Sequence, residues 1–372
     1  RIKNKIIIDT TRIDLCLPFL NTLIKKKAKI IIISHLGRPK GLRDPALSLM
    51  PIYKYLKKTL PTSVYFFTGN FDGEVKNKFS HLKEGEVILI ENIRYFNEEI
   101  NNDENFAKKL ASLGDIFVND AFSCSHRKQS SVYKITKFID KSFAGPLLKK
   151  EVDSINLVVT NKKQPVTCII GGSKISTKIN VITSLIKKID NLIIVGAMAN
   201  NFLKFDGQEI GKSLIEKGSE KYIKKIYELA IKHNCKVYKP LDFNTSTDLN
   251  GSSNYKELKE LNSKDIILDI GRKTVDLIEN VIISSKTVFW NGPAGFFENK
   301  NFASGTVAIA KQIAEKTKSG SLISIVGGGD TLASIQKTNY INKFTHLSTA
   351  GGAFLESLEG KELPAIKVLK YK

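Results

Sequence analysis

The chain has 372 residues, 42% hydrophobic and 26% charged, which is enough for one large domain or two ordinary domains with their own cores. The net charge of +21 invites a nucleic-acid-binding function, but arginine supplies only seven of the 58 basic residues and the lysines form no long blocks. No apolar run approaches the roughly 18 residues of a membrane span. We therefore expect neither a nucleic-acid partner nor a membrane partner.

The four cysteines lie far apart, with no C-x-x-C pair and no histidine at metal-ligand spacing. This pattern predicts reduced thiols in a cytoplasmic protein. The first residues also lack the apolar segment of a signal peptide, which favours the same location. The cysteines are Cys16, Cys124, Cys168 and Cys235.

Short β-branched runs alternate with helical patterns along the whole chain. Strands are expected at residues 29–34, 63–67, 86–90, 115–119, 165–170, 191–195, 236–239, 266–269, 286–290 and 322–326. Apolar residues recur near a 3.6-residue period in stretches such as 105–113 and 220–233. This alternation predicts an α/β fold with parallel sheets covered by helices on both faces, and ligands bound beyond the carboxyl ends of the strands.

A domain boundary is expected where Gly145 and Pro146 end the first half of the chain. Residues 147–159 then read as one helix, and a polar linker precedes the next strand. We therefore expect an N-terminal domain at residues 1–143, a helix and linker at 144–160, and a C-terminal domain from residue 161.

Basic residues follow three of the strands expected in the first half. A guanidinium forks onto phosphate or carboxylate oxygens, so such positions suit a bound anion. A lone arginine is more often part of a surface ion pair, but four of the seven arginines fall at such places. This recurrence predicts a small ligand with two anionic ends. The residues concerned are Arg12, His35, Arg38, Arg94, His126 and Arg127.

Glycine-rich turns follow strands in the second half. The strand at 165–170 runs into Gly171 and Gly172, with Lys174 and Lys178 spaced one turn apart at an expected helix start. Amide groups, the helix dipole and two ammonium groups there suit a polyphosphate. Further turns of this kind lie at residues 268–271, 291–298 and 348–352. Each alone could be a plain turn, but four turns after the strands of one sheet predict a phosphate site.

The stretch at residues 325–331, Ile-Val-Gly-Gly-Gly-Asp-Thr, ends an expected buried strand in three glycines and an acid. Backbone N–H groups can crowd an anion only where no Cβ intrudes. In isolation the stretch fits a bare turn equally well, but beside the other turns it predicts a phosphate corner. A carboxylate here suits a Mg²⁺ that bridges phosphates. The residues are Gly327, Gly328, Gly329, Asp330 and Thr331.

Together these segments resemble the phosphoglycerate kinase family, in family order and over nearly the whole chain. The motifs are DTTRI, SHLGRP, ENIRYF, VNDAFSCSHR, GGSKISTK, GKSL, LDIG, WNGPAGFFE, IVGGGDT and STAGGAFLE. The resemblance implies two Rossmann-like domains, each a parallel sheet with helices on both faces, joined by an inter-domain helix within residues 144–160. The C-terminal domain would span residues 161–350, and residues 351–372 would return to the first domain.

The reaction implied by the resemblance is the reversible transfer of a phosphoryl group from 1,3-bisphosphoglycerate to MgADP, giving 3-phosphoglycerate and MgATP. The two domains would close on their substrates, and a monomer would suffice. His35, Arg38, Arg94, His126 and Arg127 would hold the phosphoglycerate.

The resemblance also implies roles for the remaining site residues. Arg12 and Lys178 would stabilise the transferred phosphoryl group, with the amides of Gly351 and Gly352. Asp330 would bind Mg²⁺. The ATP or ADP pocket would consist of Gly171, Gly172, Lys174, Lys178, Gly196, Gly271, Asn291, Pro293, Glu298, Gly327, Gly328, Gly329, Asp330 and Thr331.

The chain departs from the family pattern at its start. It begins eleven residues before Arg12, without the family's first strand and its Arg-x-Asp-x-Asn segment. We therefore expect a truncated chain with unpaired strand edges in the first sheet and an incomplete substrate site. Gln129 also stands where the family usually has a second histidine.

Three alternatives to an active kinase remain: an inactive truncated remnant, a basic nucleic-acid-binding protein and a dinucleotide dehydrogenase. The dehydrogenase needs a G-x-G-x-x-G turn after its first strand. The strand at 29–34 is instead followed by His-Leu-Gly-Arg, which disfavours it.

Overall fold

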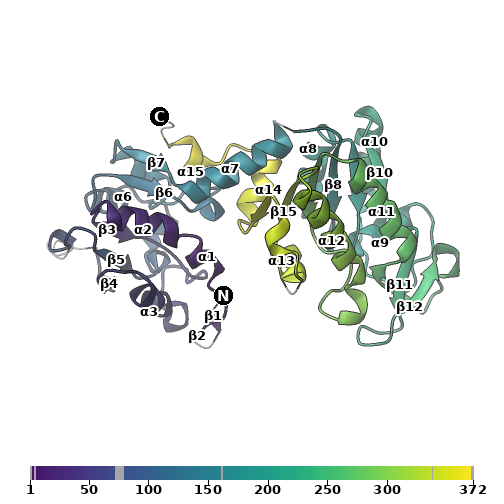
Figure 1. Cartoon of the computed structure of the whole chain (residues 1–372), viewed down its shortest axis with the longest axis horizontal. Helices are drawn as coiled ribbons and strands as arrows, with labels where there is room; N and C mark the ends of the chain where they lie inside the picture. Colours follow the sequence, from purple (N-terminus) through teal and green to yellow (C-terminus); the bar gives the residue numbers. More distant parts are fainter. Residues whose placement is uncertain (1, 4–5, 72–78, 161, 337, 370–372) are drawn as a thin grey trace. The chain divides into compact units, whose positions relative to one another are not determined.

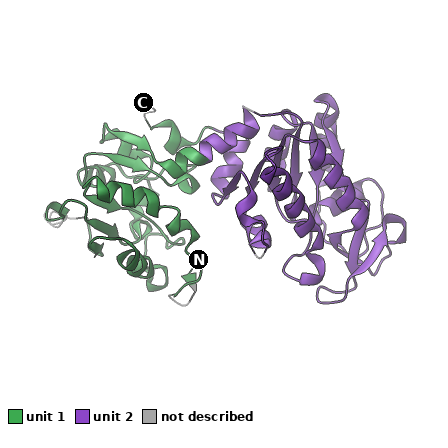
Figure 2. Ribbon diagram, in the orientation of Figure 1, with its two compact units in different colours: residues 1–150, 362–372 green, residues 151–361 purple. Residues whose placement is uncertain are grey.

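A computed structural model of the chain describes residues 2–3, 6–71, 79–160, 162–336 and 338–369 (Figure 1). The chain divides into two compact units, residues 1–150 with 362–372 and residues 151–361 (Figure 2). The division falls inside helix α7 (Pro146–Val159). Asn161, the first residue of the expected linker, lies outside the described residues.

A six-stranded parallel sheet forms the centre of the second unit, with strand order β10-β9-β8-β14-β15-β16. Strands β8, β9 and β14 are buried along their whole length, as near-continuous apolar strands covered on both faces should be. The strands are β8 (Val166–Ile170), β9 (Asn191–Ile194), β10 (Lys236–Tyr238), β14 (Thr287–Asn291), β15 (Ile323–Gly327) and β16 (His346–Ser348).

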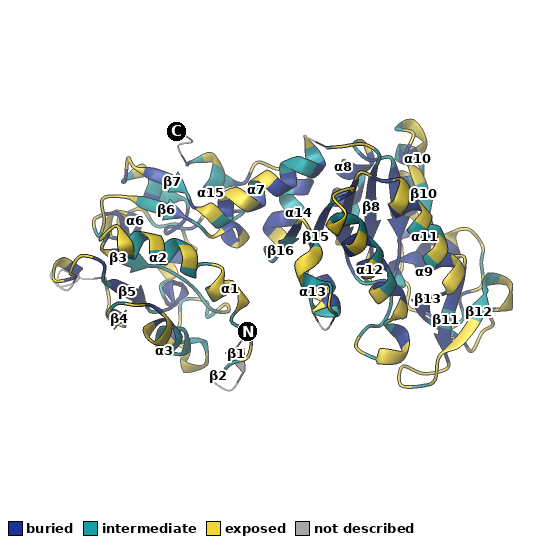
Figure 3. Ribbon diagram, in the orientation of Figure 1, coloured by how far each residue is buried: buried dark blue, intermediate teal, exposed yellow. Residues whose placement is uncertain are grey.

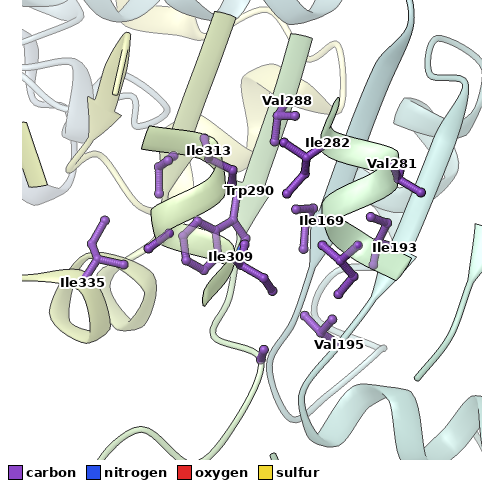
Figure 4. Close-up of a cluster of buried hydrophobic side chains, with 14 of the residues drawn as sticks. Ile169, Ile193, Val195, Val281, Ile282, Val288, Trp290, Ile309, Ile313 and Ile335 are labelled. Atoms are coloured by element: carbon purple, nitrogen blue, oxygen red, sulfur yellow. The ribbon is translucent and has the colours of Figure 1, made fainter. Parts of the chain in front are cut away.

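Helices cover both faces of this sheet. Because successive residues of a strand point to opposite faces, Trp290 packs in a core with Ile309 and Ile313 (Figure 4). Its neighbour Phe289 packs instead against Phe354, with ring centroids 5.7 Å apart. The helices of this unit are α8 (Ile179–Ile186), α9 (Ala197–Phe205), α10 (Glu220–Lys232), α11 (Arg272–Ser284), α12 (Ser304–Lys318), α13 (Gly329–Ile335) and α14 (Gly352–Leu358).

A separate antiparallel sheet, in the order β12-β11-β13, also belongs to the second unit. Its strands are β11 (Asp242–Ser246), β12 (Asn254–Glu257) and β13 (Ile266–Ile270). The sequence predicted the strand at β13 but assigned it to the parallel sheet, which was wrong. The partner strand, Asp-Phe-Asn-Thr-Ser, is mostly polar and gives no strand signal. The turn at residues 268–271 therefore does not follow a strand of the six-stranded sheet.

The first unit carries its parallel strands in two groups among the described residues. One sheet has the order β3-β5-β4 and the other pairs β6 with β7. The central strand β5 is fully buried, whereas β3 and β6 are half-exposed at most positions. Within the described residues, β3 and β6 each have one edge without a hydrogen-bonded strand. The strands are β3 (Ile30–Ile32), β4 (Val64–Phe67), β5 (Val87–Ile90), β6 (Phe117–Asn119) and β7 (Ser142–Ala144); a short antiparallel pair is β1 (Ile2–Lys3) and β2 (Ile6–Ile7).

The C-terminal segment packs on the first unit. Ala365 donates its backbone N–H to the carbonyl of Ser125 at 3.0 Å and lies in a small core with Cys124 and Val132. The helices of this unit are α1 (Thr11–Asp14), α2 (Leu17–Lys25), α3 (Met50–Thr59), α5 (Asn97–Ile100), α6 (Glu104–Ala111) and α15 (Pro364–Lys367). Short 3₁₀ helices η1 to η7 span Pro45–Leu47, Ile93–Tyr95, Phe122–Cys124, Lys134–Lys137, Leu258–Glu260, Lys300–Phe302 and Ile341–Lys343.

Most residues of the sheets are buried and are drawn dark blue in Figure 3, while the outer faces of the helices are exposed. Three of the four cysteine thiols are buried and Cys16 is half-buried; all four are free. None of the described helices has both the length and the apolar character needed to cross a bilayer.

Candidate active site

The carboxyl ends of the parallel strands of the second unit stand level with one another. Ile194, Ile170, Asn291, Gly327 and Ser348 are register partners in a single row across the sheet. The turns that follow these strands therefore start from one line at one edge of the sheet. Such an edge is where ligands bind in open α/β sheets.

Asn291 connects the three central turns. Its carbonyl oxygen accepts from the N–H of Gly171 at 2.8 Å, and its side-chain Nδ2 donates to the carbonyl of Gly327 at 2.7 Å. The hydroxyl of Thr331 accepts from the N–H of Gly292 at 2.7 Å and donates to the carbonyl of Gly327 at 3.0 Å. The turns after β8, β14 and β15 are thus held in one hydrogen-bonded group.

The glycines of these turns serve two different purposes. A Cβ at Gly171 would lie 2.3 Å from the carbonyl oxygen of Pro293, so this position requires glycine for close backbone packing. Gly328 has φ +102°, which favours glycine. In contrast, a Cβ at Gly329 or Gly351 would meet no atom within 4 Å. Those two glycines leave their backbone open to a ligand.

Lys178 does not lie where the spacing predicted. Helix α8 begins only at Ile179, so Lys174 and Lys178 precede the helix instead of sharing its first turns. The Nζ of Lys178 donates to the carbonyl of Gly171 at 2.5 Å and to that of Asn291 at 3.3 Å. Burial lowers the pKa of Lys178 to about 8, although the nearby Asp330 and a cysteine raise it. The ammonium group of Lys178 therefore lies at the glycine turns after β8 and β14, while Lys174 is exposed.

Asp330 lies in the first turn of α13 with its side chain exposed. Within the described ranges, no three His, Cys, Asp or Glu side chains gather closely enough to hold a metal ion alone. Mg²⁺ commonly takes one or two carboxylates and completes its shell with water and substrate phosphates. An exposed carboxylate beside open glycine amides fits that mode of binding.

Of two other predicted residues, Gly196 contacts the turn after β14, whereas Gly271 bonds to Asp242 of the antiparallel sheet. The N–H of Gly196 donates to the carbonyl of Ala294 at 3.2 Å, next to Pro293. Gly271 lies at the start of α11, beyond the antiparallel sheet. A cavity of about 410 Å³ between α9, β10 and α11 contains none of the predicted site residues in its lining.

In the first unit, basic side chains gather around His35. Burial, together with the charges of Arg94, Arg127 and Arg12, lowers the pKa of His35 to about 4. Arg94 is also buried, and its pKa is lowered first by burial and then by Arg127, with a smaller effect of Arg38. So many cations beside a histidine make this a place where an anion is strongly favoured.

The guanidinium of Arg94 is held by its neighbours. Its side chain is 6% exposed, and its Nη1 donates to the carbonyl of Gly37 at 3.0 Å. Its Nη2 lies 3.5 Å from Oε1 of Gln129. His126 and Arg127 follow η3 after one residue, Ser125, and are half-buried.

Asn92 is a residue that the sequence reasoning missed. It is fully buried, and its Nδ2 donates to the carbonyls of Leu36 at 2.7 Å and Leu47 at 2.9 Å. The N–H of the next residue, Ile93, donates to the carbonyl of Ser34 at 3.1 Å. Asn92 therefore ties down the loop that carries His35. An amide two residues after a fully buried strand was the available signal.

A cluster of basic side chains in one unit and glycine-rich turns at strand ends in the other are features typical of a phosphotransferase of the α/β class. The sequence profile described as "Phosphoglycerate kinase" matches residues 1–361. The chain belongs to the phosphoglycerate kinase family, which confirms the predicted fold class and reaction. That reaction is the reversible phosphoryl transfer from 1,3-bisphosphoglycerate to ADP.

Curated relatives and solved structures agree. The chain is 45% identical over 371 residues to the phosphoglycerate kinase of Wolbachia pipientis wMel, covering 99% of this chain and 93% of the relative. It is 43% identical over 373 residues to that of Dictyoglomus turgidum, covering 100% of this chain and 93% of the relative. The structure of phosphoglycerate kinase from Coxiella burnetii matches with a TM-score of 0.89 at 37% identity, covering 99% and 92%. The structure of phosphoglycerate kinase from Pyrococcus horikoshii OT3 matches with a TM-score of 0.82 at 29% identity. The match covers 99% of this chain and 93% of that one.

Proposed function

We propose that the chain carries out this reaction with the two groups of residues described above, each holding one substrate. The observation that supports the proposal most directly is the level row of strand ends, which aligns the phosphate turns of the second unit. The gathering of arginines around His35 supports the other half.

The phosphoglycerate would bind to the cationic group of the first unit. Its carboxylate and phosphate suit the forked donors of guanidinium groups. Because Arg94 is buried and held at Gly37, it would act as the fixed base of the site. The more exposed Arg38 would adapt to the ligand. The proposed ligand residues are His35, Arg38, Arg94, His126 and Arg127.

The nucleotide would bind at the strand ends of the second unit. Its phosphates would meet the glycine turns, and the exposed Glu298 would accept hydrogen bonds from the ribose hydroxyls. Asp330 would hold Mg²⁺, which neutralises phosphate charge when bound. The proposed pocket consists of Gly171, Gly172, Lys174, Lys178, Gly196, Gly271, Asn291, Pro293, Glu298, Gly327, Gly328, Gly329, Asp330 and Thr331.

Catalysis would rest on charge stabilisation, because phosphoryl transfer needs little covalent help from the protein. Arg12 and Lys178 would each supply positive charge to the transferred group. The backbone amides of Gly351 and Gly352, at the start of α14, would donate to its oxygens. To do so, Lys178 has to exchange its bonds to backbone carbonyls for bonds to phosphate.

We also propose that the protein acts as a cytoplasmic monomer, since each substrate site is built from one chain. Residues 1–143 and 161–350 would serve as the substrate domains, residues 144–160 as their connection, and residues 351–372 as the returning segment.

A coupled assay with 3-phosphoglycerate and MgATP tests the proposal. Arg38→Ala is expected to raise the KM for 3-phosphoglycerate alone, and Glu298→Ala the KM for MgATP alone. Arg43→Ala is a matched control, because Arg43 donates to the carbonyl of Thr68 and to Asn70, neither of which is a proposed site residue. The site assignment fails if Arg38→Ala and Arg43→Ala change the same constants equally.

A further inference from the structure

Asp269 is a buried carboxylate to which the proposed mechanism gives no role. It lies in β13 and is 1% exposed. Its Oδ2 accepts from the N–H of Gly305 at 2.8 Å and from the hydroxyl of Ser304 at 3.0 Å. Its Oδ1 accepts from the N–H of Ile270 at 2.9 Å. The carboxylate therefore holds the first turn of the 15-residue helix α12 from a different strand.

The same carboxylate also supports the turn that follows β14. A Cβ at Gly295 would lie 2.3 Å from Oδ1 of Asp269, so this glycine backbone rests directly on the acid. The next residue, Phe296, donates its N–H to the carbonyl of Leu268 at 2.7 Å. The preceding Ala294 donates to the hydroxyl of Thr306 in α12 at 2.9 Å. The turn is thus clamped between β13 and the helix that Asp269 holds.

This turn contacts the turns that follow β8 and β9. The carbonyl of Ala294 accepts from the N–H of Gly196 at 3.2 Å. The carbonyl oxygen of Pro293 packs so closely on Gly171 that no side chain would fit between them. A shift of the turn at 293–296 would therefore displace Gly171 and Gly196 together.

We propose that Asp269 is a positioning residue for nucleotide binding: it fixes the position of residues 293–296 and, through them, the turns at Gly171 and Gly196. This inference rests on the nucleotide site proposed above. Asp269 touches no substrate in this scheme and acts only through the backbone that it holds.

The electrostatics of the carboxyl group agree with this role. Burial raises the pKa of Asp269 to about 7 even though the bonds from Gly305, Ser304 and Ile270 act in the opposite direction. Those donors offset part of the cost of burying a charged carboxylate. Removal of the carboxylate would leave the N–H of Gly305 without its acceptor, and α12 and the turn would relax.

Asp269→Ala and Asp269→Asn test the proposal in the full chain. The alanine variant is expected to raise the KM for MgATP about tenfold, because small misplacements of a binding turn weaken ligand contacts strongly. The KM for 3-phosphoglycerate is expected to stay unchanged. Asparagine keeps one oxygen that can accept from Gly305, so it is expected to restore part of the affinity. If the alanine variant does not fold, the asparagine variant still tests the proposal, because it is expected to show a smaller rise in the KM for MgATP.

Asp190→Ala is the matched control. Asp190 also accepts a backbone N–H, that of Val166 at 2.6 Å, but at the amino ends of the strands. It is expected to lower the melting temperature without changing either KM. Glu298→Ala, which removes a proposed ribose contact, shows whether the KM for MgATP responds to the nucleotide site at all. If Glu298→Ala raises that KM but the Asp269 variants only lower stability, as Asp190→Ala does, the inference is overturned. If Glu298→Ala also leaves that KM unchanged, the nucleotide site itself is wrong, and the inference falls with it.

Discussion

The imidazole Nε2 of His346 lies 2.9 Å from Oε2 of Glu151, and both side chains are almost completely buried. The two residues are 195 positions apart in the sequence. Glu151 lies on α7 and His346 opens β16, the strand that leads to Gly351 and Gly352. This pair ties the long helix to the edge strand of the six-stranded sheet.

Removing one partner of this pair should destabilise the second unit. Glu151→Ala would leave the imidazole buried without its partner, at a cost of about 2 kcal/mol in the free energy of unfolding. Glu315→Ala is the control, since Glu315 pairs with Lys311 on an exposed helix face at 4.0 Å, where such pairs contribute little. Urea unfolding of both variants measures the difference; equal losses would contradict the expectation.

Replacing Asn92 should impair one substrate only. Asn92→Leu removes both donors to the carbonyls of Leu36 and Leu47, so the loop with His35 and Arg38 loses its support. We expect the KM for 3-phosphoglycerate to rise about tenfold, with the KM for MgATP as the internal control. A parallel rise in both constants would point to general unfolding instead.

Nucleotide affinity should depend on pH through Lys178. Its lowered pKa of about 8 means that the free enzyme loses this positive charge as the pH rises through 8. We expect the KM for MgATP to increase above that pH, with a smaller change in kcat because bound phosphate favours the charged form. Lys178→Arg stays charged and should flatten the profile. An unaltered profile in that variant would assign the titration to another group.

His35 should make the stability of the first unit depend on pH. Its folded pKa of about 4 lies below the ordinary value of 6.5, so only the unfolded chain binds this proton between those values. Stability should therefore fall as the pH drops from 6.5 to 4, by the slope of one proton. His35→Gln should remove that part of the slope. Urea titrations of both proteins at several pH values, without substrate, provide the comparison.

Asp330→Asn should weaken the response to Mg²⁺. With the carboxylate replaced, half-maximal activity is expected to require about tenfold more Mg²⁺, and chelation by EDTA should abolish activity in both proteins. Asp276→Asn is the control, because Asp276 is equally exposed but lies on the surface of α11. Identical Mg²⁺ curves for the two variants would remove Asp330 from the metal site.

The parts of this fold that could be predicted are those encoded locally. Apolar runs such as Val87–Ile90 and Val166–Ile170 mark buried parallel strands, and each strand expected from such a run is present. Basic residues after the strands of the first half indicated an anion site, because carboxyl ends of parallel strands share an edge. The ten motifs, which occur in the family's order, indicated the phosphoglycerate kinase family.

What could not be predicted depends on distant partners. The pairing of β13 with β11 was missed because Asp242–Ser246 is polar and resembles a loop. The contact between His346 and Glu151 joins residues that nothing in the sequence relates. Lys178 was expected in a helix, but the chain remains irregular until Ile179, since the preceding Gly-Gly-Ser segment disfavours an earlier start.

The level row from Ile194 to Ser348 limits where this half of the chain can change in length. One residue added within β14 would move Asn291 by about 3.3 Å and turn its side chain to the other face of the sheet. The bonds to Gly171 and Gly327 would then break together. At the opposite edge, Gly320 has open space around it, and its turn connects α12 to β15 without touching the row. Length variation among related chains should therefore collect at such amino-end connections and avoid the strands.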